Sequence, residues 1–430
     1  MSSDSEPVIE HRMDWLNFTF ESYTQYTQWM DAGYYKNCMP SGIKFDSDGR
    51  LYVSVPRWKE GVYSTLNILE NSHNNIGLLR PFPSIEENQI NNINALQSVL
   101  GFEIDLDDNI WALDQGKINN VDIIGSAKLK KYSKSGKVLD VFELNDYINI
   151  PTSFLNDIVL DIPGHHVYIT DSGVPNSAII VINTETRVIR RLLQNDESTN
   201  PDPSLWITVN NERVYQGGPT QVGVDGVALS CSKDVLYYTP LTSRILYALN
   251  TEYLKNPPKN ISKEVIKLGY KYSSSGGLVA SRNGRLYLSA LELNSILLQT
   301  DIKPNAENFQ FNLFKQIIND TKLTWPDSLS FNNQKKKLYV MANQLSSFMS
   351  GKMNFTHPVN GDSNFYIWSI YANDKSYLED CLDDDVESDD NSFPTWAIVL
   401  VVIVVLVVIA IIVCAIRSYL QAKKKRQTFL

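Results

Sequence analysis

The chain has 430 residues, 43% of them hydrophobic and 20% charged, which allows a large buried core and argues against a mainly disordered protein. Its formal charge is −9, but residues 379–390 hold a run of acids and the last fourteen residues hold a basic cluster, so the body 1–378 carries −6. A mildly acidic body without a basic stripe excludes nucleic acid as the expected partner.

Six segments of the body share one pattern, in which an alternating apolar strand, a polar turn and an aliphatic–aromatic pair follow one another. The aromatic members of these pairs are Tyr52, Trp111, Tyr168, Tyr237, Tyr287 and Tyr339, at separations of 59, 57, 69, 50 and 52 residues. A repeat of this length, with two clear strands and room for two more, is typical of propeller blades. We therefore predict an all-β fold, a six-bladed β-propeller over residues 14–378.

The two ends of the body carry features that suit closure of a ring. Segments 14–20 and 365–370 read as strands, and one of them is expected to complete the blade of the other and remove an open sheet edge. Cys38 precedes the first repeat and Cys381 follows the last, so a disulfide between them is geometrically sensible. The alternative is that these two cysteines and Cys231 are unpaired thiols.

An uncharged run rich in Val, Ile and Leu lies at residues 396–416. At ~1.5 Å per residue a helix of this length spans roughly 31 Å, the thickness of a hydrocarbon core, whereas strands rarely exceed about ten residues. Acids precede the run and Lys423–Arg426 follow it, so the positive-inside rule places the body outside the cell. We predict an extended acidic stalk (379–395), one transmembrane helix (396–416) and a basic cytoplasmic tail (417–430).

Export of the body is expected, although residues 1–17 show no signal peptide because acidic residues interrupt any apolar segment. Either the start is truncated or mis-assigned, or the protein is tail-anchored with a cytosolic body. Tail anchoring would carry the basic tail across the membrane, against the charge rule. Four N-glycosylation sequons favour an exported body. They begin at Asn17, Asn260, Asn319 and Asn354.

Short motifs are distributed over all six repeats. They include Pro56-Arg57-Trp58, Leu113-Asp114-Gln115-Gly116, Tyr168-Ile169-Thr170-Asp171-Ser172, Gly226-Val227-Ala228-Leu229-Ser230, Trp325-Pro326-Asp327 and Ala342-Asn343-Gln344. Together they resemble the yellow/major royal jelly protein family over roughly residues 14–350, with middle repeats more similar to bacterial members. The resemblance implies a six-bladed propeller, usually secreted, whose functions range from dopachrome chemistry through binding of biogenic amines to structural or nutritional roles. The apolar run near the C-terminus departs from the secreted form.

Polar residues are expected to converge at one end of the central channel, the mouth, because the innermost strand of each blade begins there and the second strand returns to it. Several acids around such a funnel would attract a cation. The alternative is that the same side chains cap turns and satisfy backbone N–H groups. The predicted ligand-binding residues are Asn156, Asp157, Asp225 and Asp327 at strand starts, with Asp114, Asp171 and Asn343 at strand ends.

These features favour an extracellular binding module for a small cationic or aromatic amine, or for another protein. A dopachrome-tautomerase-like enzyme, with mouth residues moving protons, is the first alternative. A structural or adhesive protein with a vestigial channel is another.

A metal-dependent, lactonase-like hydrolase is the sharper enzymatic rival. The related gluconolactonase propellers bind a divalent ion through Glu, Asn and Asp at strand starts, and Asn156 and Asp225 offer oxygen ligands of that kind. However, Met39-Pro40-Ser41-Gly42 stands where the glutamate is expected. We therefore expect no cofactor, with a divalent metal as the alternative.

Overall fold

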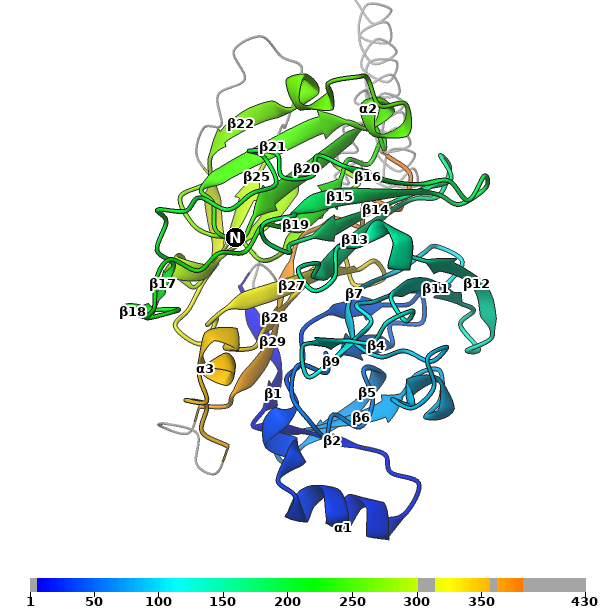
Figure 1. Ribbon diagram of the computed structural model, residues 1–430. Helices are drawn as coiled ribbons and strands as arrows, with labels where there is room; N and C mark the ends of the chain where they lie inside the picture. Colours follow the sequence, from blue (N-terminus) through cyan, green and yellow to red (C-terminus); the bar gives the residue numbers. More distant parts are fainter. Residues whose placement is uncertain (1–5, 301–313, 356–361, 382–430) are drawn as a thin grey trace, which may run out of the picture. The chain divides into compact units, whose positions relative to one another are not determined.

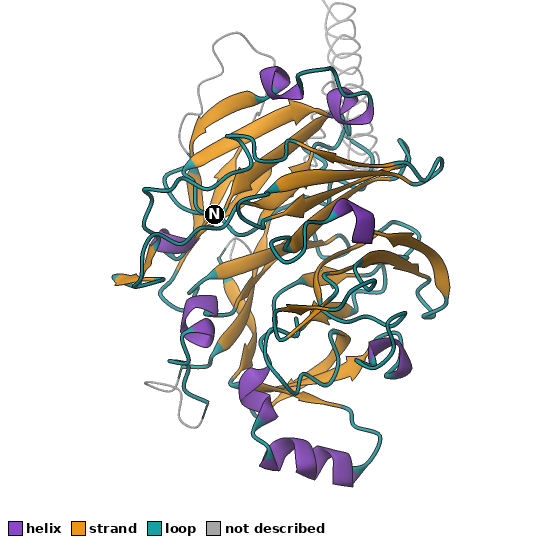
Figure 2. Cartoon of the chain, in the orientation of Figure 1, coloured by secondary structure: helices purple, strands orange, loops and turns teal. Residues whose placement is uncertain are grey.

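The computed structural model describes residues 6–300, 314–355 and 362–381, and in these ranges the chain folds into six sheets of four or five strands. The sheets fan out around a common centre in Figure 1, and strands dominate the chain in Figure 2. Within these ranges no helix is long and apolar enough to cross a membrane. The stalk beyond residue 381, the expected membrane span 396–416 and the tail 417–430 lie outside the described residues.

Each sheet is one blade, and four strands of each blade run antiparallel from the innermost outward. Blade one contains β3 (Ile43–Phe45), β4 (Leu51–Ser54), β5 (Leu66–His73) and β6 (Ile76–Pro81). Blade two contains β7 (Val99–Ile104), β8 (Ile110–Asp114), β11 (Lys128–Tyr132) and β12 (Val138–Glu143). Blade three contains β13 (Leu155–Asp161), β14 (His166–Asp171), β15 (Ala178–Asn183) and β16 (Ile189–Leu192).

The other three blades follow the same order. Blade four contains β19 (Val224–Leu229), β20 (Val235–Pro240), β21 (Ile245–Asn250) and β22 (Ile266–Tyr270). Blade five contains β23 (Leu278–Ala280), β24 (Leu286–Ala290), β25 (Ser295–Gln299) and β26 (Lys315–Asn319). Blade six contains β27 (Pro326–Asn332), β28 (Lys337–Ala342), β29 (Phe365–Tyr371) and β1 (Val8–Met13).

The innermost strands contact one another in a closed ring, in the order β3, β7, β13, β19, β23, β27 and back to β3. The six repeat aromatics all lie on the second strand of a blade and are all buried. Blades cover each other's inner strands on both faces, so these strands are mostly buried, whereas outer strands such as β12 keep exposed positions. The predicted six-bladed, all-β fold is confirmed.

Ring closure joins the two ends of the body, but not through the expected segment. β1 pairs antiparallel with β29, from Val8 opposite Ser369 to Met13 opposite Phe365. The predicted strand at 14–20 instead forms β2 (Trp15–Phe18), which pairs in parallel with β6 as a fifth strand of blade one. The propeller strands therefore begin at Val8, earlier than the expected start at residue 14.

Helices are few and short in the described ranges. α1 (Tyr23–Asp31) begins with a capping box, in which Ser22 Oγ accepts from Gln25 N and the Gln25 side chain accepts from Ser22 N. The others are α2 (Thr251–Lys255), α3 (Leu345–Met349) and the 3₁₀ turns η2 (Tyr34–Asn37), η3 (Glu86–Asn88), η4 (Asn145–Tyr147), η5 (Ile261–Glu264) and η6 (Leu291–Leu293). Two small hairpins, β9 (Lys117–Ile118) with β10 (Val121–Asp122) and β17 (Thr208–Val209) with β18 (Glu212–Arg213), lie between blade strands.

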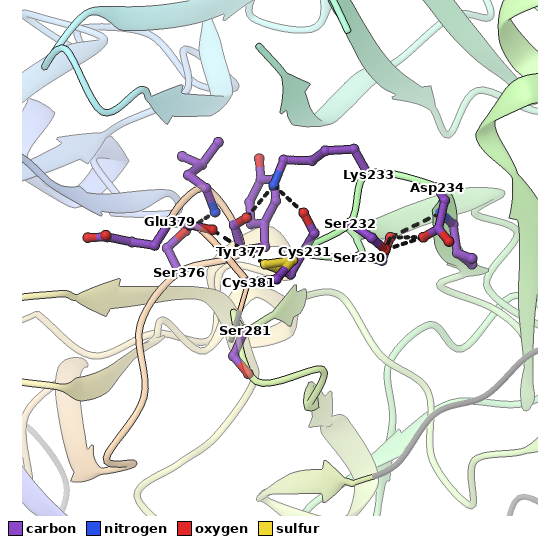
Figure 3. The surroundings of a disulfide bond; sticks show 12 residues. Ser230, Cys231, Ser232, Lys233, Asp234, Ser281, Ser376, Tyr377, Glu379 and Cys381 are labelled. Carbon is purple, nitrogen blue, oxygen red and sulfur yellow. Dashed lines mark hydrogen bonds between the residues drawn. A yellow bond between two sulfur atoms is a disulfide. The ribbon is translucent and has the colours of Figure 1, made fainter. Parts of the chain in front are cut away.

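The disulfide differs from the pairing that seemed sensible from the sequence. Cys231 and Cys381 are bonded, with their Cα atoms 5.5 Å apart, and the bond is shown in Figure 3. Cys38 is a buried free thiol. Cys38 precedes the start of β3, whereas Cys231 follows the end of β19, so the two lie toward opposite ends of the ring of inner strands.

Candidate functional site

The mouth is shaped by β-bulges in the inner strands of blades two, three, four and six. In each of these strands the pairing register shifts after the first residue. A bulge leaves its extra residue outside the ladder and re-aims side chains. The residues in the four bulges are Leu100-Gly101, Asn156-Asp157, Asp225-Gly226 and Asp327-Ser328. The polar residues predicted at the strand starts lie in these bulges, and they line the channel.

Glycine allows neighbouring inner strands to approach closely at this end. A Cβ atom on Gly101 would lie 2.3 Å from the Asn156 carbonyl oxygen, and one on Gly277 would lie 1.9 Å from the Asp327 carbonyl oxygen. Neither position has room for any other residue. The close contacts draw Asp157 and Asp327 into one narrow channel.

Three carboxylates from three blades line two adjoining cavities. Asp157 and Asp327 line a narrow axial cavity of about 40 Å³, together with Ser41 and Lys44. Asp225 and Asp327 line a mouth cavity of about 160 Å³. Because Asp327 belongs to both linings, the axial cavity continues the floor of the mouth cavity.

The wall of the mouth cavity is aromatic and aliphatic. Trp58 and Phe154 stand beside each other, with ring centroids 6.1 Å apart. Trp325 is buried and has a φ of 55°, in the left-handed region that a bulky side chain rarely occupies and that is often found at functional sites. The remaining lining residues are Leu100, Asn120, Asn156, Val222, Leu241, Leu345 and Met349. The cavity thus combines an apolar wall with an acidic floor.

Asp225 is buried and has two acidic neighbours, and both facts raise the pKa of its carboxyl group. Burial raises its pKa well above the ordinary value, and the Asp327 and Asp157 carboxylates raise it further. Lys271 and a hydrogen bond from Asn156 oppose that rise. Lys271 is itself buried and donates to the Ser243 and Ser273 carbonyls at 2.8 and 2.7 Å.

The other two acids titrate closer to neutrality. Burial raises the pKa of Asp327 to about 7, although the hydrogen bond that Asn343 donates to it at 2.7 Å opposes the shift. Burial likewise raises the pKa of Asp157 to about 6, against the opposing charge of Lys44. Lys44 forms an ion pair with Glu103 at 2.9 Å, further along the channel from the three aspartates. The site therefore presents carboxyl groups that change charge near physiological pH.

A family model described as Major royal jelly protein matches residues 97–375. This chain belongs to the major royal jelly protein family. Major royal jelly protein 3 of Apis mellifera is 26% identical over 370 residues, a match that covers 77% of this chain and 64% of that relative. The chain thus spans less than two thirds of that relative's length.

Dopaminechrome tautomerase of Drosophila melanogaster is another relative, 24% identical over 403 residues, covering 87% of this chain and 83% of that protein. A solved structure of a luciferin-regenerating enzyme aligns with a TM-score of 0.47 at 11% identity, covering 80% of this chain and 95% of that one. At a TM-score this low neither fold nor function is inferred from it.

Two of the predicted site residues of this royal jelly family member do not join the mouth. Asp114 accepts from Gln97 N, Ser98 N and Gly116 N at 2.8–2.9 Å and pairs with Lys128 at 3.1 Å. Its carboxylate is wholly buried, and it lines none of the cavities described above. The alternative role foreseen for these acids, as caps of backbone N–H groups, describes its contacts.

Asp171 has the equivalent place in blade three. It accepts from Phe154 N at 2.7 Å and Gly173 N at 3.0 Å and pairs with Arg191 at 2.8 Å. The contacts of Asn343 are also mainly internal, since it donates to the Pro40 carbonyl as well as to Asp327. The structure therefore brings together Asn156, Asp157, Asp225 and Asp327, with Asn343 behind them.

Sequence reasoning missed Phe154 and Trp325 as parts of the aromatic wall. Phe154 directly precedes β13 and Trp325 directly precedes β27, and both line the mouth cavity. An aromatic residue immediately before a predicted inner strand was therefore the signal that could have found them.

The donor set of the family member does not fit the metal of a lactonase-like site. Within the described ranges, no three His, Cys, Asp or Glu side chains are grouped so as to hold a metal ion. Asn156, one expected ligand, donates its amide to Ser172 Oγ at 2.9 Å. Ser41 and Gly42 supply no carboxylate from blade one. We derive no chemistry through a metal.

The sequons lie in different surroundings. Asn260, Asn319 and Asn354 are exposed, whereas Asn17 is half-buried on β2. The Asn17 side-chain oxygen also accepts from Phe18 N at 2.9 Å. The first three are thus better placed for glycosylation than the fourth.

Proposed function

We propose that this propeller binds a small aromatic amine at its mouth. The observation that carries the proposal is the pairing of an aromatic wall with acidic side chains in one cavity, Trp58 and Phe154 on the wall and Asp225 and Asp327 on the floor. A protonated amine pairs with a carboxylate through charge-assisted hydrogen bonds, while its ring packs on aromatic faces. The cavity volume of about 160 Å³ is smaller than the range of about 300–1,000 Å³ for drug-sized ligand sites, which favours a small amine.

Calorimetric titration of the purified full-length protein in detergent with phenylethylamine tests this proposal. Asp225→Asn and Asp327→Asn are each expected to weaken binding by about 1.5–3 kcal/mol, the scale of a charged hydrogen bond. The matched control is Asp48→Asn, whose side chain is 64% exposed beyond the other end of β3. Equal affinity in all four proteins would contradict the proposal, as would an absence of binding.

A tautomerase activity on dopachrome-like substrates is the second candidate. It is supported by the pKa of about 6 for Asp157 and about 7 for Asp327, since an acid–base group works best near the ambient pH. One carboxylate would accept a proton from a substrate carbon while a protonated carboxyl returns one elsewhere on the same molecule. A relative named dopaminechrome tautomerase points the same way. Turnover of dopaminechrome that is lost in Asp327→Asn would support this activity. Amine binding without turnover would contradict it and support only the binding function.

We also propose that the propeller is displayed outside the cell on a single membrane span at 396–416, with residues 417–430 in the cytoplasm. The uncharged run with bases behind it supports this, and the Cys231–Cys381 disulfide suits an oxidising compartment. Exposed sequons at Asn260 and Asn319 agree with export. An epitope tag at Leu430 should stain only permeabilised cells, and glycosidase treatment should increase the mobility of the protein on a gel. Staining of intact cells would contradict the orientation.

A further inference from the structure

The last described residues form a strap, defined here as residues 372–381, across the end of the channel opposite the mouth. The strap leaves β29 and touches blade six first, where Ala372 N donates to the Lys336 carbonyl at 3.1 Å. It then reaches blade five, where Arg282 N donates to the Lys375 carbonyl at 3.1 Å. It ends on blade four at the Cys231–Cys381 disulfide (Figure 3).

Tyr377 is the buried centre of this strap, with 1% of its surface exposed. Its backbone N–H donates to the Ala280 carbonyl of blade five at 3.3 Å. Its hydroxyl accepts from Leu160 N of blade three at 2.9 Å. Lys233, next to the disulfide, donates to the Tyr377 carbonyl and lies 5.1 Å from the centre of its ring (Figure 3). One residue, through its backbone and its side chain, therefore joins three blades.

The Tyr377 ring packs with the inner strands themselves. It belongs to the same buried cluster as Val159 of β13, Ala228 of β19 and Leu278 of β23. Burial raises the pKa of its phenol well above the ordinary value, and the nearby Glu103 and Asp157 carboxylates raise it further. The phenol thus lies close to two acids of the channel, Glu103 and Asp157.

The strap also walls the rest of this end of the channel. A cavity of about 230 Å³ lies there, lined on one side by Lys44 and Glu103 and on the other by strap residues Ser376 and Leu378. Lys44 lines this cavity as well as the axial cavity, so the two meet at the ion pair between Lys44 and Glu103.

We propose that the strap is a plug, locked by the Cys231–Cys381 disulfide, that closes the channel end opposite the mouth and holds β13, the strand that carries Asp157, in position. β13 runs from Asn156 and Asp157 at the mouth to Leu160 at the plug, so Tyr377 holds the far end of the strand. Tyr377 is a positioning residue in this scheme. The disulfide keeps it seated, because it bonds the strap to blade four just beyond the tyrosine.

Hydrogen–deuterium exchange and carboxyl footprinting with a carbodiimide, both on the full chain, test the plug without any ligand. Tyr377→Phe keeps the ring and removes the acceptor for Leu160 N, so exchange at Leu160 should become about two- to tenfold faster. Tyr377→Ala, and separately the double variant Cys231→Ser/Cys381→Ser, should raise labelling of Asp157 and Glu103. Labelling of Asp225, which is reached from the mouth, should stay as in the parent protein.

The matched control is Tyr371→Phe, a tyrosine 40% exposed whose hydroxyl donates to Asn373 at 3.2 Å. It should change neither readout. Exchange in β4 and β8 reports whether a variant has lost the fold as a whole. If Leu160 exchanges at the parent rate in Tyr377→Phe, or if Asp157 labelling is unchanged in both Tyr377→Ala and the cysteine variant, the plug is overturned. A uniform rise that includes Asp225 would also overturn it, because it would show general loosening.

Discussion

Asn343 donates a hydrogen bond to Asp327 Oδ2 over 2.7 Å and thereby ties the end of β28 to the bulge at the start of β27. The same amide donates to the Pro40 carbonyl at 3.0 Å, so it also links blade six to blade one. A buried amide with two such contacts has little freedom, and the acid in front of it is held at the mouth.

Removing this amide should weaken amine binding in a pH-dependent way. The hydrogen bond from Asn343 lowers the pKa of Asp327, so Asn343→Ala should raise that pKa above its value of about 7. At about pH 7 more Asp327 is then protonated, and phenylethylamine affinity should fall by about tenfold. At about pH 8.5 Asp327 is ionised in both proteins and the difference should narrow. Calorimetry at both pH values checks this; an equal loss at both would contradict it.

The stability of the protein should fall as the pH rises from about 4 to about 7. Asp157 and Asp327 have folded-state pKa values of about 6 and about 7, above the ordinary value of 3.8. The folded state therefore binds more protons than the unfolded state in this window, and the free energy of unfolding declines with increasing pH. Chemical denaturation at a series of pH values measures it.

The double variant Asp157→Asn/Asp327→Asn provides the control for that pH dependence. It removes two of the raised carboxyl titrations and should make the decline between about pH 4 and 7 shallower, while Asp225, whose pKa is also raised, still contributes to it. A parent slope that persists in the double variant would assign the effect to other groups.

The aromatic wall should discriminate between ligands. Phe154→Leu keeps an apolar side chain but removes a ring that stands beside Trp58. Affinity for phenylethylamine should fall by about 0.5–1.5 kcal/mol, the usual contribution of an aromatic pair, while affinity for butylamine should change little. Titration of both amines against both proteins gives the comparison. A loss of the same size for butylamine would mean that the ring shapes the cavity without contacting the ligand's ring.

Asp171 should matter for stability and not for ligand. Asp171→Asn removes one partner of a buried ion pair and leaves Arg191, whose side chain is 10% exposed, without its carboxylate. The free energy of unfolding should drop by about 3–5 kcal/mol. Amine affinity, measured below the melting temperature, should match that of the parent protein. A selective loss of affinity with unchanged melting would return Asp171 to the binding site.

The fold could be predicted because each blade repeats one physical requirement. Tyr52 and Tyr168 recur at matching places because the second strand of every blade buries an aromatic residue between sheets. The sequence places Asp225 and Asp327 at strand starts. Their orientation toward the channel, however, depends on a shift in strand register, which is seen only when the strands are paired in the structure.

The residues next to Asp114 in the sequence did not show that its role is structural, unlike that of the acids at the mouth. Lys128, on the third strand of the same blade, forms an ion pair with the Asp114 carboxylate. This pairing arises because the two residues lie opposite each other across the sheet. The pairing of the disulfide could not be predicted from the sequence either. Its partner depends on the end of the channel that the strap crosses, and spacing along the chain carries no information on that.

The most direct test of the mouth as an amine site is an experimental structure of the protein with bound phenylethylamine. We expect the ammonium nitrogen within about 2.7–3.2 Å of a carboxylate oxygen of Asp225 or Asp327, with the ring against Trp58, Phe154 or Trp325. Ligand bound elsewhere on the propeller, or an empty mouth at a saturating concentration of the amine, would contradict the account.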